Sequence, residues 1–245
     1  AKVGGLADVV GALPKYQNKV GKRTGVVMPF YDSNFSQNTS YKVDYTHHVK
    51  LGDLNYDFEV LEAAIEGGAF PLYQIRIPGL LDRENVYGYE DDTERFVAFQ
   101  KAVLLWVLQF ENKPEILHCH DYHTGLIPFM ASQAHEFDAL KYIPSVLTIH
   151  NAQYQGQFSF NKLHYFPPYD LSNSGLLEWD DVINPLAAAV KSSWAITTVS
   201  PSYLLELRSA AGGLEWLLDN EKKKSIGILN GIDTEVWNPE SDPMI

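Results

Sequence analysis

Residues 118–123 read HCHDYH and place three histidines and one aspartate within six positions. This density of imidazole and carboxylate groups is typical of metal sites. The order departs from the H-x-H-x-D-H pattern of metallo-β-lactamase-type hydrolases, because the aspartate and the tyrosine are exchanged. Along a strand, residues two apart share a face, so His118 and His120 would point one way and Asp121 the other. His150 could supply a further zinc ligand, but the pattern fits a zinc site poorly.

Two other interpretations of this cluster stay open. In the first, one histidine packs inside a sheet and the others are ordinary loop residues. In the second, Asp121, His123 and His150 hold a hydroxyl-rich ligand, since carboxylate and imidazole groups accept or donate hydrogen bonds in fixed directions. The residues alone therefore allow a metal site, a structural cluster or a sugar site.

The first residues of the chain offer a second candidate ligand contact. Gly4 and Gly5 precede a helix that we expect to begin near Ala7 or Asp8, and glycine lets a backbone approach a ligand closely. Free N–H groups at a helix start attract an anion, and Lys2 adds a compact positive charge suited to phosphate. Neither a P-loop nor a G-x-G-x-x-G pattern is present, so an ordinary loop is the alternative.

Two further stretches carry polar and aromatic side chains suited to a sugar. The segment TIHNAQYQGQF at 148–158 contains His150, Asn151, Tyr154 and Gln155. No G-x-S-x-G nucleophile motif accompanies it, which argues against a serine hydrolase. In DRENVYGYEDD at 82–92, Tyr87 could stack on a sugar ring, whereas the acidic run is better explained as a solvated helix entry.

The composition is that of an ordinary globular protein. The chain has 245 residues, of which 45% are hydrophobic and 20% charged, and its net charge is −12. This charge argues against a nucleic-acid partner. No apolar run reaches the length needed to cross a bilayer and no signal peptide is visible, so we expect no membrane partner. The single cysteine, Cys119, fits a cytoplasmic location.

The elements that must position these residues alternate between strands and helices. Strands are expected at 25–29, 115–120, 144–151, 195–200 and 226–229, helices at 8–19, 91–110, 124–136, 183–194 and from Pro201 with Ser200 as N-cap, and antiparallel strands at 41–49, 55–62 and 70–78. Short apolar strands separated by helices predict an α/β fold with a mostly parallel sheet, helices on both faces and an antiparallel extension around 41–78. An Asn-Gly turn, as in a hairpin, is expected at 230–233.

Three of the predicted strands end in polar motifs. HCHDYH, TIHN and TTVSPS each stand at the carboxyl end of a strand. In open parallel sheets, ligands bind beyond these ends. The three motifs together therefore indicate a ligand site more strongly than any one of them.

Five stretches resemble the motifs of bacterial glycogen and plant starch synthases. They are KVGGLADV, HCHDYHTGLIP, TIHNAQYQGQF, TTVSPSY and GILNGIDTEVWNPESDP, and they occur in the family's order over nearly the whole chain. The resemblance implies the Rossmann-like N-terminal domain of a two-domain GT-B glycosyltransferase, with this domain at 1–230 and a hinge at 231–245 toward a C-terminal nucleotide-binding domain. It also implies that the chain begins after the family's first strand.

The resemblance implies a function as well as a fold. Members of this family transfer glucose from ADP-glucose to the non-reducing end of an α-1,4-glucan with retention, without a metal or other cofactor. It implies that Asp121 and His150 face the catalytic cleft with His123 nearby, and that Lys2, Gly4 and Gly5 meet the diphosphate or the sugar. Asp8, Tyr87, Asn151, Tyr154 and Gln155 complete the predicted substrate contacts.

Two positions depart from the family pattern. Tyr122 stands where tryptophan is usual, which should change packing more than chemistry. In INPLA, Ala187 replaces a frequent lysine, and Pro185 suggests a locally different helix start. The alternatives to a synthase are a non-catalytic malto-oligosaccharide-binding domain and a metallohydrolase built on HCHDYH.

Overall fold

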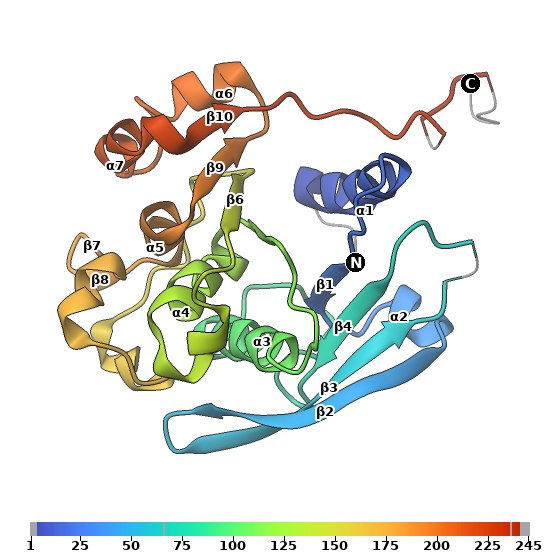
Figure 1. Cartoon of the computed structure of the whole chain (residues 1–245), viewed down its shortest axis with the longest axis horizontal. Helices are drawn as coiled ribbons and strands as arrows, with labels where there is room; N and C mark the ends of the chain where they lie inside the picture. Colours follow the sequence, from blue (N-terminus) through green and yellow to red (C-terminus); the bar gives the residue numbers. More distant parts are fainter. Residues whose placement is uncertain (1–3, 66, 236, 241–245) are drawn as a thin grey trace.

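The computed structural model describes residues 4–65, 67–235 and 237–240 as an α/β fold (Figure 1). The α-helices are α1 (Gly4–Lys19), α2 (Asn34–Asn38), α3 (Asp92–Val107), α4 (Ile127–Gln133), α5 (Pro185–Ser192), α6 (Pro201–Glu206) and α7 (Glu215–Asn220). The strands are β1 (Val26–Pro29), β2 (Tyr41–Leu51), β3 (Leu54–Ala63), β4 (Leu72–Arg76), β5 (Leu117–His120), β6 (Ser145–Ile149), β7 (Glu178–Trp179), β8 (Val182–Ile183), β9 (Ala195–Thr198) and β10 (Ser225–Gly227). The 3₁₀ helices are η1 (Tyr122–Thr124), η2 (His135–Leu140), η3 (Phe160–Tyr165), η4 (Leu171–Leu176) and η5 (Lys222–Lys224).

The strands form two main sheets. One is entirely parallel and has the order β10-β9-β6-β5. The other has the order β1-β4-β3-β2, in which only β1 and β4 are parallel. The predicted α/β class and the antiparallel extension around 41–78 are thus confirmed. The structure differs from the prediction in one respect: the parallel strands are divided between two sheets instead of lying in one.

Helix α3 lies between the two sheets and is buried on all sides. It packs against β2 and β4 of the mixed sheet and against α4 and η1 of the parallel half. All residues from Arg95 to Val107 are buried. The predicted apolar spacing therefore describes a central helix that joins the two halves of the core, rather than a helix with one solvated face.

The polar residues inside α3 each satisfy backbone groups of a different segment. The amide oxygen of Gln100 accepts the N–H of Leu126 at 2.7 Å. The Lys101 ammonium donates to the carbonyl oxygens of Lys50 and Tyr165. Because buried polar groups are stable only when they are hydrogen-bonded, these contacts specify where the surrounding loops lie.

Several predicted boundaries were wrong. Helix α1 already includes Gly4, the first described residue, instead of beginning near Ala7 or Asp8. The predicted helix at 124–136 is divided into η1, α4 and η2, because Pro128 starts a new helix and Ala134 is extended. Residues 230–233 form no hairpin, since β10 runs parallel to β9 and the N–H of Asn230 donates to the carbonyl of Val199.

Other local predictions are confirmed. Ser200 is the N-cap of α6, and its hydroxyl accepts the N–H of Tyr203 at 3.0 Å, with Pro201 as the first helical residue. Among the described residues, no helix is both long enough and apolar enough to cross a membrane.

We expect Arg95→Ala to lower the free energy of unfolding by about 3–5 kcal/mol. The Arg95 side chain is fully buried, pairs with Asp92 at 2.5 Å, and donates to the carbonyl oxygens of Leu80, Asn85 and Val86. Its removal leaves these oxygens without a donor. Urea unfolding measures the loss.

Arg76→Ala is the matched control for this variant. It also removes an arginine–carboxylate pair, but the side chains of Arg76 and Glu59 are 40% and 30% exposed. The expected loss is below about 1 kcal/mol. Equal losses in the two variants would contradict the role assigned to Arg95.

Candidate active site

The carboxyl ends of β5, β6 and β9 lie side by side at one edge of the parallel sheet. Strand β6 is paired on one side with β5 and on the other with β9. Beyond the last paired residues, the N–H of Asp121 donates to the carbonyl of Thr148 at 3.0 Å. The three polar motifs therefore meet at one edge, as the alternation of strands and helices predicts.

Asp121 joins the ends of β5 and β6. Its carboxylate oxygen Oδ1 accepts the backbone N–H of His150 at 2.7 Å and that of Asn151 at 3.3 Å. The residue is buried and has φ 54° and ψ −170°, a conformation that non-glycine residues rarely adopt. Burial raises the pKa of the Asp121 carboxyl to about 6, against the opposing effect of the two N–H donors.

Three histidines from the ends of β5 and β6 pack together. The Nδ1 atom of His120 lies 3.0 Å from the Nε2 atom of His150, at hydrogen-bond distance. The ring centroids of His118 and His120 lie 4.3 Å apart, so the two side chains share a face of β5, as predicted. The Nε2 atom of His118 bonds the hydroxyl of Thr148 at 2.7 Å, and this hydroxyl bonds that of Thr197 at 2.6 Å.

Burial keeps these imidazoles neutral. Burial, together with the smaller effect of the nearby His118, lowers the pKa of His150 to about 4. Burial, followed by the neighbouring histidines, also places the pKa of His120 well below its usual value. A neutral imidazole has one donor and one acceptor nitrogen, which suits a hydroxyl-rich ligand and avoids charge repulsion within the cluster.

His123 lies in an aromatic environment. Its ring stacks on Tyr122 with centroids 3.8 Å apart and meets the edge of Phe96 at 4.7 Å. The Nε2 atom is buried without a hydrogen-bond partner, and burial lowers the pKa of His123 to about 4. Tyr122 in turn packs on Gly156, where φ is +70° and an added Cβ would lie 2.2 Å from the Tyr122 ring.

The remaining residues of the 148–158 segment have different environments. Asn151 and Tyr154 are exposed and available to a ligand, and Tyr154 is 66% exposed. Gln155 is buried, and its amide nitrogen donates to the carbonyl oxygens of Ala211 and Gly212 at 3.1 and 2.9 Å. The structure therefore shows a bracing role for Gln155, whereas Asn151 and Tyr154 face solvent.

The N-terminal motif is only partly described. Lys2 lies outside the described residues. Gly4 and Gly5 form the first turn of α1, Gly4 has φ +70°, and Asp8 follows one turn later on the same helix. Tyr87 lies in the loop before α3 and is 53% exposed.

The alanine that departs from the family pattern is a core residue. Ala187 is fully buried in α5, and its N–H donates to the side chain of the N-cap residue Asn184 at 3.0 Å. Pro185 occupies the first helical position, where proline is favoured. The predicted local difference is therefore an ordinary capped helix start.

The sequence analysis considered His118 and His120 only as possible metal ligands, and it did not assign Thr148, Thr197 or Tyr203 to the site. The hydroxyl of Tyr203 accepts the N–H of Ala152 at 3.1 Å and thereby braces the loop after β6. Alternation along β5 places His118 and His120 on one face, but only strand pairing brings Thr148 of β6 and Thr197 of β9 to them. Over the described ranges, no group of three or more His, Cys, Asp or Glu side chains is arranged to hold a metal ion.

Polar loops at the carboxyl edge of a parallel sheet define a ligand-binding α/β domain of the Rossmann-like class. The family of starch synthase catalytic domains matches residues 1–220. A glycogen synthase from Flavobacterium johnsoniae is 52% identical over 245 residues, and one from Streptococcus sanguinis is 38% identical over 251 residues. Each alignment covers 100% of this chain and 52% of the relative.

The chain is also similar to a solved structure from the same family. It is the catalytic domain of starch synthase IV from Arabidopsis thaliana bound to ADP and acarbose, with a TM-score of 0.87 and 32% identity over 100% of this chain and 52% of that one. The chain belongs to the starch synthase catalytic domain family, and the predicted resemblance is confirmed. The chain spans about half the length of the curated relatives it matches.

We expect Asp121→Asn to stabilise the fold above pH 6. The carboxyl pKa is raised from 3.8 to about 6 in the folded protein, so ionisation above pH 6 costs roughly 3 kcal/mol that an amide avoids. The amide oxygen can still accept the two N–H groups. Urea unfolding at pH 8, 6 and 4 should show a gain that disappears toward pH 4.

Asp57→Asn, at an exposed position of β3, is the control and should change stability little at any pH. If Asp121→Asn destabilised the protein equally at all three pH values, the assigned effect of the buried charge would be wrong.

Acid should destabilise the protein through its buried histidines. His123 and His150 have folded pKa values of about 4, below the unfolded value near 6.5, so the unfolded state binds more protons between pH 6.5 and pH 4. Each histidine therefore removes roughly 2 kcal/mol of stability by pH 5. Asp121 partly offsets this loss, because its raised pKa makes the folded state bind a proton in the same range.

The test is His123→Phe, which removes one such group and its buried nitrogen without a partner. Thermal unfolding from pH 7.5 to pH 5 should show a shallower acid loss than in the parent. His48→Phe, at an exposed position of β2, should keep the parent's pH dependence. An unchanged acid loss in His123→Phe would refute the explanation.

Proposed function

We propose that this chain is the acceptor-side half of a glycosyltransferase that moves glucose from ADP-glucose to the non-reducing end of an α-1,4-glucan with retention. The observation that carries the proposal is the junction of Asp121 with the His150 segment at the carboxyl edge of the parallel sheet. Membership of the starch synthase family supports it. ADP and acarbose, bound to the related starch synthase IV, are a nucleoside diphosphate and a glucan-like ligand of the kind proposed here.

In the proposed reaction, the bond between the anomeric carbon of glucose and the diphosphate breaks, and a bond to the acceptor hydroxyl forms. The anomeric carbon gains positive charge in the transition state. A neutral His150 imidazole stabilises that charge without repelling it, which agrees with a His150 pKa of about 4. The departing diphosphate takes the proton of the acceptor hydroxyl, and no cofactor enters this scheme.

The proposed substrate contacts extend around this centre. We assign the diphosphate to the start of α1, where the N–H groups near Gly4 and Gly5 and the Lys2 ammonium would offset its charge. Asp121 and His150 would bind the donor glucose. Asp8, Tyr87, His123, Asn151 and Tyr154 remain proposed contacts, and Gln155 would act on the ligand through the backbone it braces.

We also propose that residues 1–230 are the acceptor-side domain and that 231–245 lead to a C-terminal nucleotide-binding domain. Support comes from the apolar side chains of Ile228, Leu229 and Ile232, which are 54%, 75% and 65% exposed and would be covered by such a domain. A cytoplasmic location is supported by Cys119, a buried free thiol.

The test is glucose transfer to glycogen by the full-length parent, with ADP-glucose, UDP-glucose and ADP-glucose plus EDTA in parallel. We expect transfer from ADP-glucose that survives EDTA, and none by the 245-residue chain alone, because both halves of the cleft are needed. Removing the imidazole in His150→Ala should lower turnover by about 100-fold or more.

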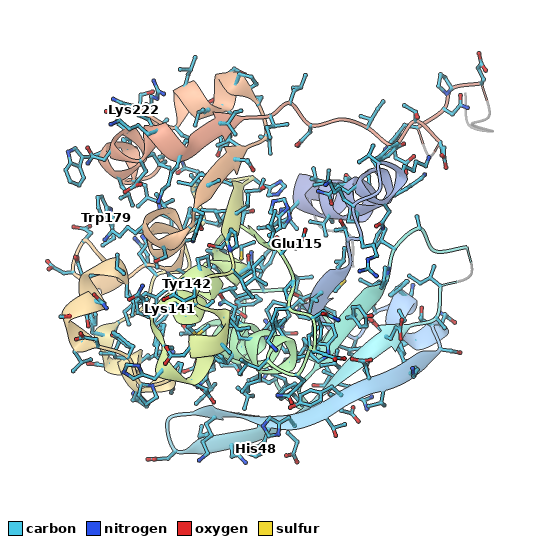
Figure 2. All side chains as sticks on the ribbon, in the orientation of Figure 1. His48, Glu115, Lys141, Tyr142, Trp179 and Lys222 are labelled. Atoms are coloured by element: carbon cyan, nitrogen blue, oxygen red, sulfur yellow. The ribbon has the colours of Figure 1, made fainter. Side chains whose placement is uncertain are left out.

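His48→Ala is the matched control, because its side chain projects from β2 at the opposite side of the molecule from α6 and β10 (Figure 2). It should leave turnover unchanged. Transfer from neither donor would refute the synthase function and leave a glucan-binding domain. Undiminished turnover in His150→Ala would refute only the role of His150 and would leave the synthase function standing.

A further inference from the structure

The sequence contains one Asn-Gly pair, Asn230–Gly231, and it lies just beyond β10. Both residues are exposed and belong to no helix or strand. Asparagine is among the chemically labile residues of proteins, and its lability depends on the residue that follows it. A following glycine favours reaction, because no Cβ hinders its nitrogen and its backbone rotates freely.

The two groups that react with each other in such a pair are free. Within the part of the chain that the structure describes, no hydrogen bond holds the side-chain amide of Asn230 or the backbone N–H of Gly231. The pair is tied to its surroundings by the N–H of Asn230, which donates to the carbonyl of Val199 at 3.1 Å. A Cβ added at Gly231 would meet no atom within 4 Å, so the backbone there is open to solvent.

These free groups can form a ring. The N–H of Gly231 loses its proton to hydroxide, and its nitrogen attacks the side-chain carbonyl carbon Cγ of Asn230. The amide nitrogen of the side chain takes up a proton and leaves as ammonia, which closes a five-membered succinimide. Water then opens the ring at Cγ to give aspartate, or at the main-chain carbonyl carbon to give isoaspartate. The net reaction consumes one water and releases one ammonia.

Another asparagine with a small neighbour is protected by its structure. Asn173 precedes Ser174, but it lies in the 3₁₀ helix η4. Its side-chain nitrogen donates to the Oε1 atom of Gln133 at 2.9 Å, and its N–H donates to the carbonyl of Asp170 at 2.9 Å. A bound amide and a helical backbone both oppose ring closure. Asn173 is therefore the internal reference for Asn230.

The segment after the Asn-Gly pair is anchored to α1. The carboxylate of Asp233 accepts the Lys15 ammonium at 3.1 Å and the Tyr16 hydroxyl at 3.2 Å. The carboxylate of Glu235 accepts the ammonium groups of Lys15 and Lys19 at 2.6 and 2.8 Å. Figure 1 shows this segment running from β10 toward α1. The chain is thus held to α1 directly after the pair.

The span between the two anchored points is short. Only Gly231 and Ile232 separate Asn230, which is bonded to the residue after β9, from Asp233 on α1. In an isoaspartyl linkage the main chain runs through the side-chain carbon of residue 230, which adds one atom to this span. The extra atom shifts the residues that follow, so their contacts with α1 weaken.

We propose that Asn230 is a modification site, converted without an enzyme through a succinimide to isoaspartate and aspartate, and that the isoaspartyl form releases residues 231–235 from α1. The reaction needs only water and hydroxide. The proposal does not depend on the proposed function, because the reacting groups and the contacts with α1 belong to this chain alone.

The test keeps the full-length parent at pH 8.5 and 37 °C and follows its peptides by mass spectrometry. We expect the peptide with residue 230 to lose its asparagine form and gain the mass that replacement of NH₂ by OH produces. The product should accept methyl groups from protein isoaspartyl methyltransferase. The peptide with Asn173 should stay unchanged over the same period, and conversion at residue 230 should be severalfold slower at pH 7.

Gly231→Ala is the matched variant. Gly231 does not have a positive φ and has open space around it, so alanine fits without strain. The added methyl group should slow the conversion of Asn230 severalfold. Asn230→Gln should remain unmodified, since it would have to close a six-membered ring. An unmodified parent, or equal conversion in the parent and in Gly231→Ala, would overturn the proposal.

Hydrogen exchange tests the release from α1. The N–H of Glu235 donates to the Asp233 carboxylate at 3.0 Å, and the N–H of Trp237 donates to the Asp233 carbonyl at 2.8 Å. Exchange of these amides should be faster in the aged parent than in the fresh parent, and unchanged in aged Gly231→Ala. Fresh Asn230→Asp, which has the new charge without the added atom, should exchange like the fresh parent. Parent-like exchange after full conversion would overturn the release.

Discussion

The candidate site depends on one interaction. The Asp121 carboxylate accepts hydrogen bonds from two backbone N–H groups. It joins the loop after β5 to the loop after β6 and sets the course of the chain at His150 and Asn151. The carboxylate is buried to make these bonds, which raises its pKa to about 6, and the backbone of Asp121 adopts an uncommon conformation. Strain and a buried charge at one residue are typical of positions kept for function.

Burial governs the chemistry of the site in a second way. The imidazoles of His118, His120 and His150 are close together, and as cations they would repel one another. Burial lowers the pKa of each, so the cluster is neutral near pH 7. Neutral imidazoles provide directional hydrogen bonds to hydroxyls and do not repel a developing positive charge, two properties that the proposed glucosyl transfer would use.

Buried polar side chains hold surface loops in place by hydrogen bonds to their backbone. Buried polar side chains of α3, such as Gln100 and Lys101, locate the loops around them by satisfying their backbone groups. Gln155 does this nearer the surface, where it fixes the loop that precedes α7. Precise placement of exposed groups in this protein thus depends on hydrogen bonds made beneath them.

The sequence by itself determined the α/β class, the antiparallel extension, the Ser200 N-cap and the meeting of three polar motifs at one sheet edge. These features follow from local periodicity and from the rule that parallel strands share an edge. It also placed His118 and His120 on one face of a strand, because alternation is a local property.

Only the tertiary structure decided what the individual polar side chains contact. It paired His120 with His150, buried Ala187 and Gln155, and stacked Trp179 on Trp216. These contacts join residues far apart in the chain. The pKa of His150 is lowered by burial and, to a smaller extent, by the nearby His118. Local sequence patterns carry no information about such distant neighbours, so neither the contacts nor the pKa values could be predicted from them.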